Sequence, residues 1–402
     1  MLEQPLPSPS LASPAAQHAP PPPASAGERL LAIDQVRGLV IVLMVLDHVR
    51  DFFSNAQFSP TDLAKTTPAL FLTRWITHFC APAFVFLAGT SAFLAGRKLS
   101  RPALSRFLAS RGLWLIVVEF TVVSFAWSFN LDYRMGLVMQ VIWAIGASMC
   151  CLSLLVWLPL GAVATLGGGM IAAHNLLDAV TPESWGPYAP LFTLLHVQAR
   201  IPIGFVVYPL IPWVGVMCVG YAFGALYARS AAQRNRLTLG LGAAGCAVFI
   251  ALRALNGYGD PAPWSPQSSG LFTTLSFLNV SKYPPSLAYL LMTLGPMLLA
   301  LWALERWPRA WLAPLVTFGR VPLFAYVVHL LIAHITAGAL GALLGYGPVI
   351  LGEFPFFYPP DWGFSLPWVY AAWGAVLFCL YPACHWFAGV KGRRKDFWLK
   401  YL

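Results

Sequence analysis

The sequence "RLLAIDQVRGLVIVLMVLDHVRDFF", residues 29–53, combines a long apolar run with charged residues near both ends. An α-helix crosses ~30 Å of hydrocarbon with about 20 mainly apolar residues, so this stretch is long enough to span a bilayer. Similar apolar stretches follow at 72–96, 107–129, 137–158, 160–177, 203–227, 237–256, 285–305, 313–340 and 366–388. The sequence therefore predicts an all-α fold, a polytopic transmembrane helical bundle of about ten helices.

Two places leave the number of helices open. The fourth and fifth segments are separated only by the four residues 158–161, which contain a proline and a glycine. A re-entrant or amphipathic segment near 190–202 or 345–360 would bring the number to eleven.

The composition excludes an ordinary soluble domain. Hydrophobic residues make up 58% of the 402 residues and charged residues 10%, and the mean hydropathy is +0.68. The formal net charge of +10 is not gathered into one basic domain, so nucleic acid is not predicted as a partner. The predicted surroundings are the lipid bilayer.

Lysine and arginine gather in alternate connections, which sets the orientation because these residues are retained on the cytoplasmic side. They follow the second, sixth, eighth and last segments, at 97–111, 229–236, 306–309 and 391–400. The other connections hold more of the acids: Asp62, Asp178, Glu183, Asp260, Glu353 and Asp361. Ten helices with both termini cytoplasmic satisfy this pattern, which places the end of the first helix at the outer face.

The predicted organisation is one membrane domain, residues 29–390, between two tails. Residues 1–28 are rich in proline, alanine and serine, and we expect a disordered cytoplasmic tail there. Residues 391–402 form a basic tail on the same side of the membrane.

Motifs for metals and nucleotides are lacking. The seven cysteines lie in or beside apolar segments without a Cys-x-x-Cys pair, so neither a disulfide framework nor a zinc site is predicted. No P-loop, dinucleotide, His-Glu-x-x-His or Gly-x-Ser-x-Gly motif occurs in a usable context. We therefore expect no metal.

The first helix carries its ionisable residues at helical spacing. Asp34 and Arg37 are three residues apart and can pair. Arg37 and His48 are eleven apart, so they share a face and are separated by ~16 Å along the axis. Ionisable groups inside a membrane usually face the bundle interior, which favours a functional stripe. The alternative is a structural ion pair together with a polar cap at the interface.

The second helix repeats this arrangement, with Arg74 and His78 one turn apart near its outer end. A single histidine in an apolar helix is more often a packing residue than a catalyst. Two histidines beside Asp47 and Asp51 favour catalysis, because a carboxylate can orient an imidazole and set its basicity. Further candidates lie later in the chain, and they are Lys282, Tyr283, Arg320, Tyr326 and His329. His334 and His385 are interpreted as structural.

Four stretches carry a family resemblance: residues 29–53, and "PALFLTRWITHFCAPAFVFLAGTSAFL", "SKYPPSLAYLLMTLGP" and "FGRVPLFAYVVHLLIAH". They resemble bacterial members of the heparan-α-glucosaminide N-acetyltransferase catalytic-domain family (DUF1624), over nearly everything from Arg29 to the last helix. The first helix is also similar to that of membrane O-acyltransferases acting on surface polysaccharides. The resemblance implies an acyltransferase in the bacterial cytoplasmic (inner) membrane. Acetyl-CoA or another acyl-CoA would be the donor, and the acceptor would be a sugar or glycan on the outer side.

One departure from the lysosomal branch bears on catalysis. That branch has its essential histidine in the loop after the first helix, whereas residues 49–73 here contain no histidine. His48, which matches the O-acyltransferase position, becomes the leading catalytic candidate and His78 the second. Asp47 or Asp51 would orient His48.

Roles in binding follow the chemistry of acyl transfer, which needs cations for the oxyanion and for the phosphates of CoA. We assign acceptor binding to five residues, which are Arg50, Arg74, Lys282, Tyr283 and His329. We assign donor binding to Asp34, Arg37 and Arg320.

Other readings of the chain stay open at this point. A carrier that exports a small metabolite would also contain buried Arg, Asp and His. A non-catalytic membrane subunit is a third reading. The acceptor, the acyl chain length, direct transfer or an acyl-histidine intermediate, and the oligomeric state, with a dimer as one option, are not fixed by the sequence.

Overall fold

The computed structural model describes residues 31–131, 133, 136–307, 310–394, 396 and 399. The chain divides into Met1–Leu30 and the compact unit Leu31–Leu402. The predicted tail at residues 1–28 lies outside the described residues. At the other end the last helix, α16 (Leu366–Arg393), continues through the first residues of the predicted basic tail.

Eight helical stretches among the described residues are long and apolar enough to cross a membrane. They are Pro68–Gly96, Arg101–Ser128, Leu160–Leu177, Leu210–Ala228, Ala231–Leu255, Leu287–Arg306, Pro322–Leu343 and Leu366–Arg393. Two further helices occupy the remaining predicted positions. These are α1 (Leu31–Phe53), which carries several charges, and α6 (Val141–Leu155), which has only 15 residues. The all-α, polytopic fold is therefore confirmed.

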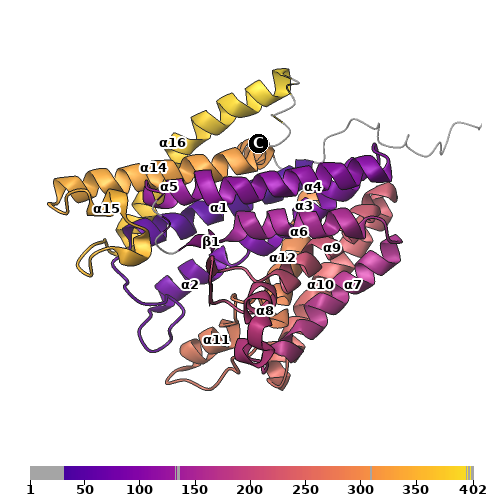
Figure 1. Cartoon of the computed structure of the whole chain (residues 1–402), viewed down its shortest axis with the longest axis horizontal. Coiled ribbons are helices and arrows are strands. Elements are labelled where there is room, and N and C mark those ends of the chain that lie inside the picture. Colours follow the sequence, from indigo (N-terminus) through magenta and orange to yellow (C-terminus); the bar gives the residue numbers. More distant parts are fainter. Residues whose placement is uncertain are drawn as a thin grey trace, which may run out of the picture. The chain divides into compact units, whose positions relative to one another are not determined.

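These stretches contain most of the named helices (Figure 1). The first two hold α2 (Pro68–Thr77), α3 (Cys80–Gly96), α4 (Arg101–Val118), the π-helix η1 (Glu119–Val123) and α5 (Ser124–Ser128). The next two hold α7 (Leu160–Ala173), η2 (His174–Leu177), α9 (Leu210–Phe223) and η4 (Gly224–Ala228). The others are α10 (Ala231–Leu255), α12 (Leu287–Arg306), α14 (Pro322–Leu343) and α16.

Two predicted helices are each divided in the structure, 72–96 into α2 and α3 and 313–340 into α13 and α14. The apolar segment 313–340 forms α13 (Ala313–Arg320) and α14, separated at Val321, which has φ −133° and ψ 52°. Pro322 explains the break, because proline disfavours the helical conformation of the residue before it.

Short elements fill the connections. They are η3 (Pro182–Tyr188), α8 (Ala189–His196), α11 (Gly270–Leu278), η5 (Ala310–Leu312), α15 (Val349–Gly352) and η6 (Pro355–Phe357). Strands β1 (Leu137–Met139), β2 (Arg200–Ile201) and β3 (Gly204–Val206) form a small sheet in the order β1-β3-β2. The two ranges in which a re-entrant or amphipathic eleventh segment is an option contain only short elements, α8 and β2 in 190–202 and α15 and η6 in 345–360.

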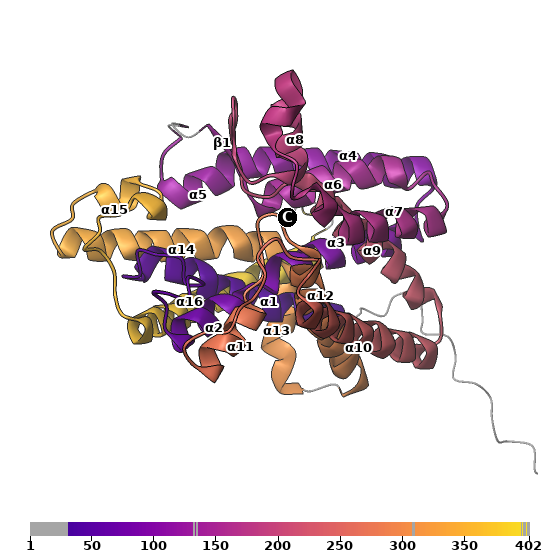
Figure 2. The ribbon, with the colours of Figure 1, turned by 90° about the horizontal axis from the view of Figure 1, so that it is seen from below.

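The charged first helix lies at the centre of the bundle. It packs against α2, α3, α12, α13, α14 and α16, and Figure 2 shows α1 among several of these helices. Its closest neighbour is α13, where two glycines allow the backbones to meet. A Cβ atom on Gly38 would lie 1.9 Å from the Leu315 carbonyl oxygen, and one on Gly319 would lie 1.9 Å from that of Asp34. Small residues at such a crossing are typical of helix packing in membranes.

The contacts between helix ends fall into two groups, one at each face of the bundle, and the charge pattern of the loops predicts the same two groups. On the face assigned to the cytoplasm, Arg234 Nε lies 3.0 Å from Glu305 Oε2, and Arg97 donates to the Tyr227 carbonyl oxygen (3.4 Å). On the opposite face, three hydrogen bonds join connections that are distant in sequence: Asn279 to Thr61, Tyr258 to Ala172 and Asn55 to Phe364. Which face meets the cytoplasm is a prediction from the loop charges.

Candidate active site

His48 and His329 form a pair between two helices of the bundle. His48, on α1, and His329, on α14, approach with Nδ1 of His48 2.7 Å from Nε2 of His329. Their rings are stacked, with centroids 4.9 Å apart and an interplanar angle of 14°. The contact joins residues 281 positions apart in the sequence. The fold therefore creates a histidine dyad from two helices.

The hydrogen bonds assign the protons of this dyad. His329 Nδ1 lies 2.8 Å from the Ala325 carbonyl oxygen, which can only accept, so this nitrogen carries a hydrogen. In a neutral ring Nε2 of His329 is then an acceptor, and Nδ1 of His48 donates to it. This arrangement leaves the lone pair of His48 on Nε2, where it can take up a proton.

Aromatic side chains enclose the dyad. Trp127 meets the His48 ring edge-on with centroids 5.0 Å apart, and Tyr326 does so at 5.7 Å. His329 is 0% exposed, whereas His48 keeps a partly exposed side chain. His48 is therefore the member of the pair that a reactant can reach.

An ion cluster lies next to His48 on the same helix. Asp47 accepts hydrogen bonds from Arg50 (2.9 Å), Arg74 (2.5 Å) and Thr77 (2.8 Å). Arg50 also donates to Asp51 at 2.7 Å. Both carboxylates are thus held by arginines, and no hydrogen bond joins either of them to His48 among the described residues. The His48 ring instead meets His329, and an orienting role of Asp47 or Asp51 stays a prediction.

His78 is buried one turn beyond Arg74. It is 3% exposed, and its Nδ1 has no hydrogen-bond partner among the described residues. Its backbone carbonyl accepts a hydrogen bond from the Tyr289 hydroxyl at 2.7 Å. His78 therefore lies in the same buried region as the ion cluster, and its role stays a prediction.

Lys282 and Tyr283 reach this region from the connection before α12. The Lys282 ammonium lies 5.1 Å from the centre of the Tyr283 ring, and Tyr208 packs edge-on against that ring. Burial alone would raise the pKa of the Tyr283 hydroxyl, but the charges of Lys282 and Arg74 bring this pKa below its ordinary value. The structure thus brings together the predicted outer residues from α1, α2 and the 282–283 connection.

The predicted donor residues lie toward the other end of α1. Arg37 pairs with Asp34 at 3.3 Å and also donates to the Leu87 carbonyl oxygen and the Ser91 hydroxyl. These bonds join α1 to α3, so the pair has a structural role whether or not it binds a ligand. Arg320 is exposed at the end of α13, and its carbonyl oxygen lies 3.5 Å from Lys391 Nζ.

Two pockets lie on opposite faces. One of about 250 Å³ has Arg97 and Arg101 in its lining, on the face assigned to the cytoplasm. The other, of about 270 Å³, lies between α5, β1 and η6, and its polar lining includes Asn130, Gln140 and Glu353. Trp127, which contacts His48, also stacks on a lining residue of this outer pocket, Phe354, at 5.1 Å.

Two further residues near the site, Glu119 and Trp127, were not predicted from the sequence. Glu119 opens the π-helix η1, is 0% exposed, and accepts a hydrogen bond from the Trp143 backbone at 2.9 Å. A π-helix often marks a functional position, and this carboxylate is the single acid of the predicted segment 107–129. Trp127 could not be singled out from the sequence, because aromatic residues are frequent throughout the chain.

The fold and the site define an integral membrane protein that carries a histidine dyad within a helical bundle. The chain belongs to the family described as heparan-alpha-glucosaminide N-acetyltransferase, catalytic, which matches residues 29–258. Its function is therefore of the membrane acetyltransferase kind. No curated protein matches the chain significantly. The family match contains His48 and His78 but ends before Lys282, Arg320 and His329, so it is shorter than the resemblance to the last helix that we expected.

Proposed function

We propose that this protein transfers an acetyl group from acetyl-CoA, bound from the cytoplasmic side, to a hydroxyl or amine of a sugar-type acceptor on the outer side. The membrane would be the bacterial inner membrane. The observation that carries this proposal is the His48–His329 dyad, in which a neutral His48 keeps its lone pair on Nε2 and the residue is partly exposed. Family membership supports the kind of reaction.

His48 acts as the general base. The acceptor oxygen or nitrogen attacks the thioester carbonyl carbon while Nε2 of His48 takes the proton of the acceptor. The tetrahedral intermediate then collapses, and the carbon–sulfur bond breaks. The proton passes from His48 to the departing thiolate, so the products are the acetylated acceptor and free CoA. An acetyl-His48 intermediate would use the same nitrogen as nucleophile.

Lys282 is the best placed cation for the oxyanion. Arg50 and Arg74 are already engaged by Asp47 and Asp51, which limits their freedom to bind a ligand. Lys282 makes no salt bridge within the described residues, and its ammonium lies over Tyr283. A cation held beside the developing negative charge lowers the barrier to acyl transfer.

The two pockets suit the two substrates. Arg97 and Arg101 offer positive charge for the phosphates of CoA on the inner face. Arg37, Asp34 and Arg320 stay proposed donor contacts on that side. The outer pocket offers amide and carboxylate groups for sugar hydroxyls, and Trp127 links it to His48.

The experiment uses purified protein reconstituted in lipid vesicles that contain radiolabelled acetyl-CoA, with hexosamines and oligosaccharides outside. We expect labelled acceptor and an equal amount of free CoA, both dependent on the protein. Label that leaves the vesicles without acylation of any acceptor would favour a carrier. Vesicles with His48→Ala protein provide the matched control, because this variant should bind acetyl-CoA without transferring the acetyl group.

A further inference from the structure

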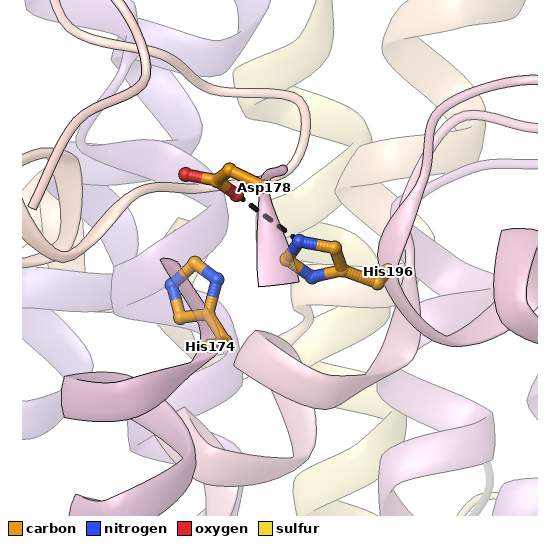
Figure 3. A group of neighbouring side chains, drawn as sticks. All are labelled: His174, Asp178 and His196. Carbon is orange, nitrogen blue, oxygen red and sulfur yellow. Dashed lines mark hydrogen bonds and ion pairs between the residues drawn. The ribbon is translucent and has the colours of Figure 1, made fainter. Parts of the chain in front are cut away.

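A second group of titratable side chains lies away from the dyad. His174 begins η2, Asp178 follows the end of η2, and His196 ends α8. One ligand atom from each residue can be chosen so that all three lie within 4.8 Å of one another. Figure 3 shows the two imidazoles and the carboxylate turned toward a common point.

The imidazoles of this cluster are buried, and three of their four ring nitrogens lack a hydrogen-bond partner among the described residues. His174 and His196 are each 2% exposed. Neither ring nitrogen of His174 has a hydrogen-bond partner among the described residues, and Nδ1 of His196 has none either. The Pro285 carbonyl group lies near His174, but it forms no hydrogen bond with either ring nitrogen. A buried polar atom left without a partner costs about 1–3 kcal/mol, and a cation at this place would satisfy one nitrogen of each ring.

We propose that His174, Asp178 and His196 bind one divalent transition-metal ion, with Zn²⁺ the best fit. Two imidazoles and one carboxylate form a common zinc ligand set, with a fourth position for water. Hard ions such as Mg²⁺ prefer oxygen ligands, so the two imidazoles select against them.

The geometry needs only small side-chain movements. Ligand atoms about 2.0–2.2 Å from a tetrahedral zinc ion stand ~3.4 Å apart, against the present limit of 4.8 Å. His196 Nε2 already lies 3.0 Å from Asp178 Oδ1, and Asn175 donates to Asp178 Oδ2 at 2.7 Å. The bond from Asn175 holds the carboxylate in place, as outer partners do in metal sites.

The cluster lies between the connections that hold η2, α8 and the start of α12, and a bound metal ion could stabilise them. Asn175, next to His174, accepts a hydrogen bond from the Leu287 backbone at 2.9 Å. Leu287 begins α12, five residues after Lys282 of the proposed active site. A metal ion would therefore join η2 and α8 and brace the start of α12. This role is structural and independent of the proposed acyl transfer.

The test is metal binding by the full-length protein, purified without a polyhistidine tag and stripped with a chelator. Addition of ZnCl₂ should give one bound Zn²⁺ per chain by elemental analysis and calorimetry, and should raise the thermal unfolding temperature. MgCl₂ should have neither effect. His174→Gln and His196→Gln should each weaken Zn²⁺ binding at least about tenfold, whereas the exposed His385→Gln should leave it unchanged.

Cobalt supplies a readout that needs no variant. Co²⁺ added to the stripped wild-type protein should give the intense visible absorption of a four-coordinate site, and Zn²⁺ should abolish it. The proposal is wrong if the wild-type protein binds neither ion at micromolar concentration. It is also wrong if folded His174→Gln and His196→Gln proteins bind Zn²⁺ as tightly as the His385→Gln control.

Discussion

His48 Nδ1 lies 2.7 Å from His329 Nε2, and the second nitrogen of His329 lies 2.8 Å from the Ala325 carbonyl oxygen. This chain of contacts fixes both tautomers. In a serine protease triad a carboxylate holds the catalytic histidine in the same way. A neutral imidazole in that place orients the base without adding negative charge, and two imidazolium ions at this distance would repel each other. At most one ring of the dyad is therefore an imidazolium ion.

The first prediction concerns the base itself. His48→Ala should lower kcat by about 10²–10⁴, because general-base catalysis contributes that much. Binding of acetyl-CoA and the unfolding temperature should change little. Transfer rates and binding isotherms measure the two effects, and His385→Ala on the exposed face of α16 is the control. Turnover near the wild-type rate in His48→Ala would move the assignment to His78.

The second prediction separates orientation from packing. His329→Leu fills the space but accepts no hydrogen bond, so the hydrogen of His48 would no longer be held on Nδ1. We therefore expect kcat to fall at least about tenfold with KM nearly unchanged. His329→Gln offers an amide oxygen to His48 Nδ1 and should recover part of the rate. Both variants should unfold at similar temperatures. If the Leu and Gln variants had equal kcat, His329 would be a packing residue only.

The sequence allowed the helices to be placed but not their partners. Length and apolarity located ten segments, because the thickness of the hydrocarbon core sets the length of each spanning helix independently of the others. The break between α13 and α14 was missed although Pro322 marks it, since the apolar run continues through the proline. Helix packing depends on surfaces that no single segment reveals.

In the candidate site too, local features were predicted and contacts between distant segments were not. Helical spacing placed Arg37 and His48 on one face of α1, which is a local property. It suggested Asp47 or Asp51 as the residue that orients His48, whereas the hydrogen bond of His48 in the structure is to His329, 281 residues away. The cluster of His174, Asp178 and His196 was missed for the same reason, since the fold brings α8 back to η2.

The third prediction concerns the buried ion cluster. Arg74→Ala removes the closest partner of Asp47 and leaves that carboxylate with Arg50 and Thr77. Removing one member of a buried ion pair costs about 3–5 kcal/mol, so the unfolding temperature in detergent should fall clearly. The double variant Asp47→Asn with Arg74→Gln should be more stable than Arg74→Ala. If Arg74→Ala unfolded like the wild type, the pair would contribute nothing to stability.

The fourth prediction tests the crossing of α1 and α13. A methyl group at Gly38 would overlap the Leu315 carbonyl oxygen, so Gly38→Ala should destabilise the protein by at least about 1–3 kcal/mol. A methyl group at Gly240, on α10, would meet no atom of a neighbouring described element within 4 Å, and Gly240→Ala should be neutral or stabilising by about 0.5–1 kcal/mol. Thermal unfolding in one detergent measures both. Equal stability of the two variants would contradict the close approach of α1 and α13.

The fifth prediction concerns the donor pocket. If Arg97 and Arg101 meet the phosphates of CoA, Arg97→Gln and Arg101→Gln should each weaken acetyl-CoA binding about tenfold or more, because hydrogen bonds to charged groups contribute about 1.5–3 kcal/mol. The loss should be larger at low salt than at high salt, since both arginines are exposed and their charges are screened. Isothermal calorimetry with detergent-purified protein measures the dissociation constants.

Two controls make this prediction specific. Arg106 lies on the same helix as Arg101 but outside the pocket lining, so Arg106→Gln should bind acetyl-CoA like the wild type. Acetyl-pantetheine lacks the nucleotide and should bind equally to the wild type and to both pocket variants. If the pocket variants lost affinity for acetyl-pantetheine as well, the arginines would act through the fold of α3 and α4. If they bound acetyl-CoA normally, the nucleotide would have to lie elsewhere, and Arg37 and Arg320 would become the residues to test.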